Sequence, residues 1–224
     1  MKCFCLDIET TGTDDEKDVV LEVAGAVADL SLSPYSDLTN EFRILVMPER
    51  ALTVELRVLA MHADLWRELD SYEEAMEKKE VLKVADDFYV VKSAKLMAIF
   101  SLFANAIKKN HFPLQKRMTV AGKNSDFDLK FLKRINSEFG QFFYSRKLDP
   151  GGLWVMESDD KPPDTKTCAE RMQMMFPGMP VMTQHKAMED NRLVAWLMRG
   201  GFRRLGMFGG PQWVESDSLE ERKP

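Results

Sequence analysis

Residues 3–12 read CFCLDIETTG, an alternating apolar segment that ends in two acids and a turn. Side chains of a strand point alternately to its two faces, so Asp7 and Glu9 share one face with two small residues, Cys3 and Cys5. The other face carries three apolar residues, Phe4, Leu6 and Ile8. Two carboxylates at the head of a strand buried on both sides are costly unless they are paired or bind metal. The alternative is a strand that reaches solvent at Asp7, but the tight turn after Glu9 favours two acids that project from a strand end.

A second segment, residues 127–139, predicts a helix with one acid at the head of its apolar face. Counted from Asp128, apolar residues fall three, four, seven and eleven positions later, at Phe131, Leu132, Ile135 and Phe139. The same count from Asp126 gives a mostly solvated face. Helix geometry therefore favours Asp128 as the inward residue and Asp126 as the helix N-cap.

Residues 186–198 predict another helix of this kind. From Asp190, apolar residues follow on one face at Leu193, Val194, Leu197 and Met198. Glu189 instead meets Arg192 and is expected at the surface. An acid in the first turn also stabilises a helix through the helix dipole, so a purely structural role stays open for either acid taken alone.

His185 lies five residues before Asp190. On a regular helix, five steps place two residues roughly 140° apart, so the two converge only if His185 precedes the helix. A loop histidine with a pKa near neutrality suits the role of general base. The four acids need something positive among them, and a pair of divalent metal ions, which serves phosphodiester cleavage best, is the expected partner.

The composition is that of an ordinary soluble globular protein, with 45% hydrophobic and 30% charged residues among 224. No apolar run approaches the roughly 20 residues that span a membrane. Three cysteines make neither a disulfide framework nor a zinc pattern, so we expect a cytoplasmic protein with reduced thiols. The formal net charge of −5 argues against a broad clamp on nucleic acid but allows a small metal-loaded pocket for a strand end.

Strand and helix patterns predict an α/β domain in residues 1–200, followed by a tail in residues 201–224 that is expected to be partly disordered. The first three strands are joined by short links, which favours an antiparallel meander. The expected strands are residues 2–8, 19–30, 40–48, 117–122 and 141–149. Residues 71–110 are expected to be mainly helical, and further helices are expected at residues 127–139, 167–176 and 186–198.

Three short motifs in this order resemble those of the DEDDh exonucleases, the DnaQ-like superfamily that includes polymerase proofreading subunits and oligoribonuclease. DIETTG at 7–12 matches D-x-E-T/M-T-G, NSDFD at 124–128 matches N-x-x-F-D, and HKAMED at 185–190 matches H-x-A-x-x-D. Each motif alone is weak, whereas the three together make a specific pattern across residues 4–200. The resemblance implies an RNase H-like exonuclease fold, with a mixed five-stranded sheet in which three antiparallel strands precede parallel ones.

The resemblance also implies a metal-dependent 3′→5′ exonuclease that acts on single-stranded DNA or RNA. Asp7, Glu9 and Asp190 would hold one Mg²⁺ or Mn²⁺ ion, and Asp7 with Asp128 would hold a second. His185 would take the proton of the attacking water, and the product would be a nucleoside 5′-monophosphate.

Substrate contacts follow from the same resemblance. The backbone around Thr10, Thr11 and Gly12 is expected to receive the 3′-terminal nucleotide, and Asn124 is a further residue expected to bind the substrate. Two segments, LEVAGAVAD at 21–29 and FFYSRKLD at 142–149, look like oligoribonuclease, in which case His62 would contact a base and Arg146 a 5′-phosphate. The alternative for His62 is a histidine on the surface of a helix without a substrate contact, and the alternative for Arg146 is a solvated strand residue. Two features depart from oligoribonuclease. Thr13 stands where that enzyme has a leucine, and the second motif has the spacing of the proofreading subunits.

Two other interpretations stay open. An oligoribonuclease-like enzyme would degrade very short RNA, and a non-catalytic polymerase or replisome subunit would use the fold for docking. The complete set of five site residues disfavours the second interpretation, because so costly a cluster has no purpose in a docking module. A homodimer is a further possibility, and no membrane partner is expected.

Overall fold

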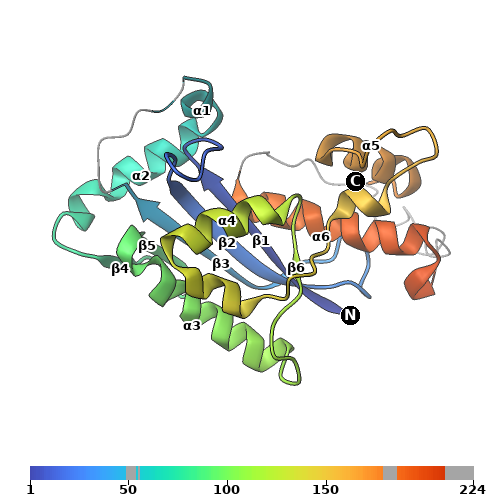
Figure 1. The fold of residues 1–224 in the computed structure, drawn as a ribbon, viewed down its shortest axis with the longest axis horizontal. Coiled ribbons are helices and arrows are strands. Elements are labelled where there is room, and N and C mark those ends of the chain that lie inside the picture. Colours follow the sequence, from blue (N-terminus) through green and yellow to red (C-terminus); the bar gives the residue numbers. More distant parts are fainter. Residues whose placement is uncertain (49–53, 55, 179–185, 210–224) are drawn as a thin grey trace, which may run out of the picture.

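The computed structural model describes residues 1–48, 54, 56–178 and 186–209. At its centre lies a six-stranded sheet with the order β4-β5-β3-β2-β1-β6 (Figure 1). The strands are β1 (Lys2–Thr10), β2 (Val20–Asp29), β3 (Thr39–Met47), β4 (Val81–Lys83), β5 (Phe88–Lys92) and β6 (Val120–Ala121). β1, β2 and β3 pair antiparallel, as predicted, while β6 runs parallel to β1 and β5 runs parallel to β3.

The α/β fold with a mixed, helix-flanked sheet is confirmed, but the described residues form six strands instead of the expected five. Residues 81–92, expected within a long helix, form the antiparallel β4–β5 hairpin. Its segments VLK and FYVVK are rich in β-branched and aromatic residues, which favour a half-buried strand over a helix.

Residues 141–149 do not form the expected strand. They meet the sheet edge through two isolated bridges, Met118 with Phe143 and Ala121 with Leu148. Phe142 and Phe143 are both buried in the same core cluster. Successive side chains of a strand point to opposite faces, so burying two neighbours on one side is incompatible with regular strand geometry.

The described helices are α1 (Leu56–Met61), α2 (Ala63–Met76), α3 (Ser93–His111), α4 (Ser125–Ile135), α5 (Thr165–Met175) and α6 (Ala187–Arg204). Three 3₁₀ turns are η1 (Ser137–Phe142), η2 (Pro150–Leu153) and η3 (Met207–Gly209). α6 continues past the expected domain boundary at residue 200, and most of the expected tail lies outside the described residues. No described helix is both long and apolar enough to cross a membrane.

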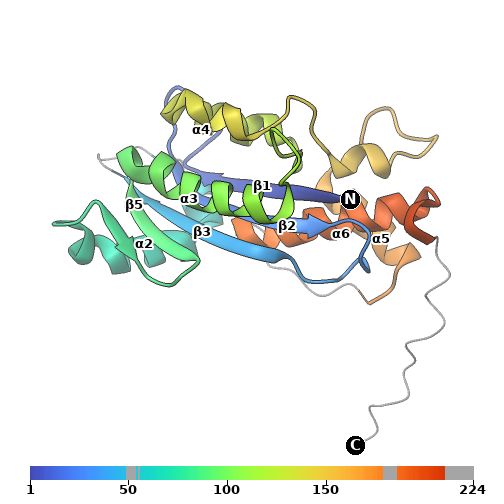
Figure 2. The same ribbon diagram turned by 90° about the horizontal axis from the view of Figure 1, so that it is seen from below.

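Helices cover both faces of the sheet (Figures 1 and 2). α3 and α4 pack against one face in the main core, to which β1 contributes Phe4, Leu6 and Ile8. α6 packs against the other face over Cys3 and Cys5, and α2 packs there near β3 and β5. The side chains of β1 are therefore distributed between its two faces as the sequence predicts. Asp7 and Glu9 lie on the face that α6 covers.

Gly25, in the middle of β2, has no room for a side chain. A Cβ atom there would lie 2.5 Å from the Phe42 ring and 2.7 Å from the Phe4 ring. We expect Gly25→Ala to lower the free energy of unfolding by about 1–3 kcal/mol, since the two buried rings have to move. Urea unfolding measures this loss.

Gly152→Ala is the matched control, because a Cβ atom at this exposed position meets nothing within 4 Å. Its effect should stay within about 0.5 kcal/mol. Equal unfolding midpoints for the two variants would contradict the packing argument.

Candidate active site

Three carboxylates converge where β1 ends and α6 begins. Asp7, Glu9 and Asp190 each place an oxygen so that these atoms all lie within 4.8 Å of one another. Asp7 and Glu9 come from one face of β1, and Asp190 comes from the first turn of α6. The packing of α6 on β1 therefore assembles a site from residues about 180 positions apart in the chain.

Asp128 approaches the same strand from the opposite face of the sheet. Its carboxylate accepts a hydrogen bond of 3.1 Å from the backbone N–H of Ile8, which lies between Asp7 and Glu9. Asp128 is 4% exposed, whereas the side chain of Asp126 is 82% exposed and pairs with Lys147. The helical register thus selects Asp128, as predicted.

One detail of the start of α4 differs from the prediction. The N-cap of α4 is Asn124, with φ of 57°, and Asp126 lies within the first turn of the helix. A left-handed residue directly before the helix lets the chain turn sharply out of β6, which moves the helix start towards the strand. On α6, Arg192 donates to Glu41 of β3 at 2.6 and 3.3 Å.

The pKa values of three carboxyl groups in this cluster are raised. Burial, followed by the repulsion of Asp190 and Glu22, raises the pKa of Glu9 to about 8. Burial raises the pKa of Asp128 to about 7, against the opposing effect of its backbone hydrogen bonds. The pKa of Asp7 lies well above its usual range, again through burial first and then the neighbouring Asp128 and Glu9. An all-oxygen donor set that resists ionisation could hold a hard divalent cation, which would remove this repulsion.

Glu22 is a buried acid beside the cluster that the sequence patterns did not assign. It lies directly across from Glu9 in the β1–β2 pairing and is 2% exposed. The guanidinium of Arg43 donates to Glu22 and, through two hydrogen bonds of 2.5 and 2.8 Å, to Glu68 of α2. An acid in the interior of the apolar strand VLEVAGAVAD was the available signal, because an unpaired buried carboxylate is costly.

Arg43 therefore links α2 to the sheet and compensates the negative charge of Glu22 beside the carboxylate cluster. We expect Arg43→Met to lower the free energy of unfolding by about 2 kcal/mol, less than for a fully buried pair because Arg43 is 27% exposed. Chemical denaturation without divalent ions measures the loss. The double variant Arg43→Met with Glu22→Gln should recover part of it, and strictly additive losses would contradict the pairing.

His62 is the N-cap residue of α2 and is 3% exposed. Its Nε2 lies 3.6 Å from Oε2 of Glu9, so the structure brings it to the cluster, against the alternative of a surface histidine. Beside it opens a pocket of about 360 Å³ between the starts of α2 and α6, whose lining includes Glu22, Arg43, Lys186 and Arg192.

The remaining predicted site residues lie in different parts of the fold. Thr10, Thr11 and Gly12 form the end of β1 and the turn after it, immediately beyond Glu9. Asn124 precedes α4, and its backbone N–H donates to Asp149 at 3.0 Å. Arg146 is exposed between the two isolated bridges. His185 lies outside the described residues, so its predicted position before the helix stays a prediction.

No protein-family model matches the sequence, and no curated protein matches it. Solved structures match the fold. A full-length 3′-exonuclease aligns with a TM-score of 0.54 and 13% identity, over 92% of this chain and 81% of the other. An Exonuclease I from Methylocaldum szegediense aligns with a TM-score of 0.47 and 14% identity, and the match spans 92% of this chain but only 41% of that protein. The six-stranded sheet and its covering helices thus form a fold that a solved 3′-exonuclease shares.

Proposed function

We propose that this protein is a metal-dependent 3′→5′ exonuclease that removes nucleotides from single-stranded nucleic acid. One observation carries the proposal: four carboxylates from β1, α4 and α6 gather around the end of β1, with Glu9 and Asp128 buried and Asp7 and Asp190 partly buried. Burial alone makes such a group costly, so the cluster is explained best by cations that the protein is built to hold. The three sequence motifs and the fold shared with a 3′-exonuclease support the same reaction class.

We assign two ions, Mg²⁺ or Mn²⁺, to this cluster. Asp7, Glu9 and Asp190 would hold the first, and Asp7 with Asp128 would hold the second. When bound, such a pair stabilises the negative charge that develops on the attacking and leaving oxygens of a phosphodiester. The oxygen-only donor set fits these hard cations and does not suit softer metals.

The protein's own residues would position the strand end and move the proton. The turn at Thr10–Gly12 would receive the 3′-terminal nucleotide, and His62, next to Glu9, would contact its base or sugar. Asn124 and Arg146 would bind the strand further from its end. His185 would accept the proton of the attacking water, and the product would be a nucleoside 5′-monophosphate.

The direct test uses 5′-labelled single-stranded DNA and RNA oligomers with Mg²⁺, with Mn²⁺ and with EDTA. A ladder that shortens from the 3′ end, needs a divalent ion and yields nucleoside 5′-monophosphates is expected. Cleavage of neither substrate under any condition would sink the proposal, and internal cleavage products would redirect it to an endonuclease.

A second candidate is an oligoribonuclease-like enzyme for very short RNA. It is favoured by the buried His62 at the edge of a pocket of about 360 Å³, a volume suited to one or two nucleotides rather than a long strand. Rates on dinucleotides and on 20-residue RNA separate the two candidates. Faster cleavage of dinucleotides would select the second, and faster cleavage of the longer strand the first.

A non-catalytic subunit of a polymerase or replisome is the remaining alternative, and a homodimer is compatible with each of the three. Pull-down of a polymerase together with absent hydrolysis would favour the subunit. Light scattering of the purified protein determines the oligomeric state independently of activity.

A further inference from the structure

Within the turn after β1, the side chain of Asp18 contacts both Thr11 and Asp14. Oδ1 of Asp18 accepts a hydrogen bond from the Thr11 hydroxyl at 3.1 Å, and Oδ2 accepts one from the backbone N–H of Asp14 at 2.9 Å. The Thr11 hydroxyl in turn accepts the Val19 N–H at 3.0 Å, and the Thr11 N–H donates to the Val19 carbonyl at 3.0 Å. Both ends of loop 11–19 therefore meet at the Asp18 carboxylate.

The same carboxylate explains why position 12 is a glycine. A Cβ atom on Gly12 would lie 2.6 Å from Cγ and 2.7 Å from Oδ1 of Asp18. The φ angle of Gly12 is outside the left-handed region, so its backbone conformation is open to other residues. A side chain at position 12 would thus have to displace the Asp18 carboxylate, whereas the backbone geometry accepts it.

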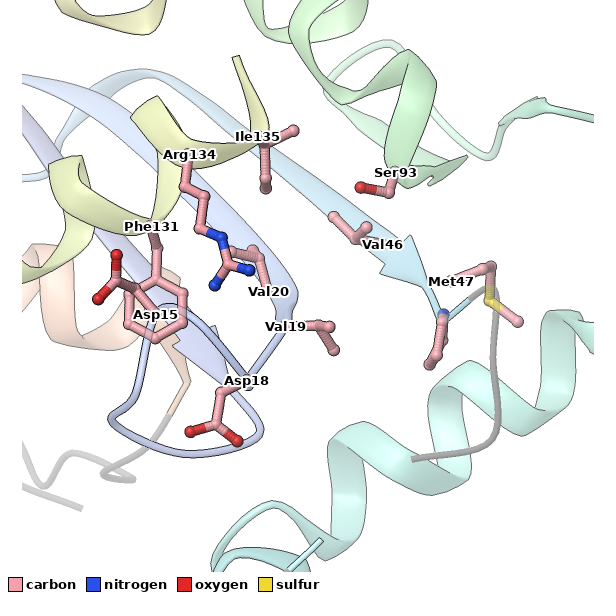
Figure 3. A pocket seen from close by; sticks show the side chains of 11 residues that line it. Asp15, Asp18, Val19, Val20, Val46, Met47, Ser93, Phe131, Arg134 and Ile135 are labelled. Carbon is pink, nitrogen blue, oxygen red and sulfur yellow. The ribbon is translucent and has the colours of Figure 1, made fainter. Parts of the chain in front are cut away.

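On one side this loop borders open space. A pocket of about 490 Å³ lies on the side of α3 and α4, and its lining includes Asp15, Asp18, Phe131 and Arg134 (Figure 3). Thr11 is buried, and Lys130 of α4 pairs with Asp15 at 2.5 Å. Asp18 lies at the wall of the pocket, so the loop depends there on the hydrogen bonds of its carboxylate.

The loop lies directly beyond the carboxylate cluster. Thr10 ends β1 next to Glu9, and its hydroxyl donates to the Gly12 carbonyl at 2.6 Å. A shift of Thr11 or Gly12 therefore changes the surface presented at the end of β1, while Asp7 and Glu9 stay in the sheet through their pairing with β2.

We infer that Asp18 is a positioning residue that holds Thr11 and Gly12 in the shape that receives the 3′-terminal nucleotide. This inference rests on the proposed exonuclease function. Asp18 acts through the loop and is not a metal ligand, so its loss alters substrate binding and leaves the metal site intact.

The test compares Asp18→Asn with Glu16→Gln. Both remove one negative charge from the same loop, but Glu16 is exposed and takes no part in the contacts to Thr11 and Gly12. The amide oxygen of an asparagine can accept the Asp14 N–H, but its NH₂ group would have to donate to the Thr11 hydroxyl, which now donates to Asp18. The variant therefore replaces two hydrogen bonds to a charged carboxylate by weaker neutral ones and reverses one of them. We expect KM for the better of the two single-stranded oligomers to rise roughly tenfold in Asp18→Asn, with kcat within about threefold and Mn²⁺ affinity unchanged. Glu16→Gln should match the wild type.

A second pair of variants tests the contact itself. Gly12→Ala should raise KM because the methyl group displaces the Asp18 carboxylate. In Asp18→Ala the obstacle is gone, so adding Gly12→Ala should cost less there than in the wild type. Equal costs in both backgrounds would show that Gly12 is required for another reason and would overturn this contact.

Amide hydrogen exchange of a peptide that covers residues 10–19 supplies a readout independent of activity. Exchange should be faster in Asp18→Asn than in the wild type and in Glu16→Gln. An active wild type in which Asp18→Asn keeps its KM would overturn the positioning role alone. A wild type that cleaves neither DNA nor RNA would overturn the proposed function, whatever the exchange rates are.

Discussion

Asp128→Asn is expected to lower the rate of 3′-end cleavage by roughly 10²–10³-fold, which corresponds to several kcal/mol of lost charge stabilisation in the transition state. An asparagine can still accept the Ile8 N–H, so the connection between α4 and β1 survives. What is lost is one negative oxygen of the cluster. Single-turnover kinetics with saturating Mg²⁺ measures the effect on the chemical step.

Asp126→Asn provides a closely matched control for this variant. It removes the same charge from the same helix two residues away, where the side chain is 82% exposed. Its pairing with Lys147 is solvent-exposed and contributes little stability. We expect activity within about twofold of the wild type. Similar losses in both variants would mean that helix charge, and not the inward carboxylate, governs the rate.

The stability of the metal-free protein is expected to fall as the pH rises from 5 to 9. The pKa of Glu9 is raised to about 8 and that of Asp128 to about 7, both above the values near 4 in an unfolded chain. A raised folded pKa gives stability that is complete below the unfolded pKa and is lost as the pH passes through the folded pKa. The loss should therefore extend up to the pH range of about 7–8.

The expected magnitude is several kcal/mol, or roughly 10 °C in the melting temperature of a domain of this size. The groups that face these acids are Asp7, Asp190, Glu22 and His62, with Arg43 behind Glu22. Thermal unfolding in EDTA between pH 5 and pH 9 measures the decline.

Saturating Mg²⁺ or Mn²⁺ should flatten this pH profile, because bound cations favour the ionised carboxylates. Asp128→Asn should flatten it in part without metal, since one of the repelling groups is gone. A melting temperature that rises with pH in EDTA would contradict the proposed electrostatic state of the cluster.

The sequence predicted the central part of the site because local periodicity was sufficient there. Alternation along β1 assigned Asp7 and Glu9 to one face, and the 3.6-residue period chose Asp128 over Asp126. Each inference depends only on the direction of a side chain within one element. Neighbouring apolar residues determine that direction, since they must reach the core.

The same kind of argument was insufficient where two elements compete for one residue. Residues 81–92 lay within the segment 71–110 that was expected to be mainly helical, but pairing of β5 with β3 buries Val90 and Val91 in the sheet. The sequence pattern of residues 141–149 favours a strand. In the structure Phe142 and Phe143 are both buried, which a regular strand does not allow on one face. In residues 81–92 strand pairing agrees with the β-branched and aromatic residues of the segment, whereas in residues 141–149 core packing outweighs a weak local preference for a strand.

By itself, the sequence determined which acids face inward and in what order they occur, because those properties follow from residue spacing within single helices and strands. Only the tertiary structure decided which groups surround them: Glu22 across from Glu9, Arg43 reaching to Glu68, His62 at 3.6 Å from Glu9, and Asp18 against Gly12. The physical reason is that charge balance and loop shape depend on distances between separate elements. Those distances are set by strand pairing and helix packing, which no local period encodes.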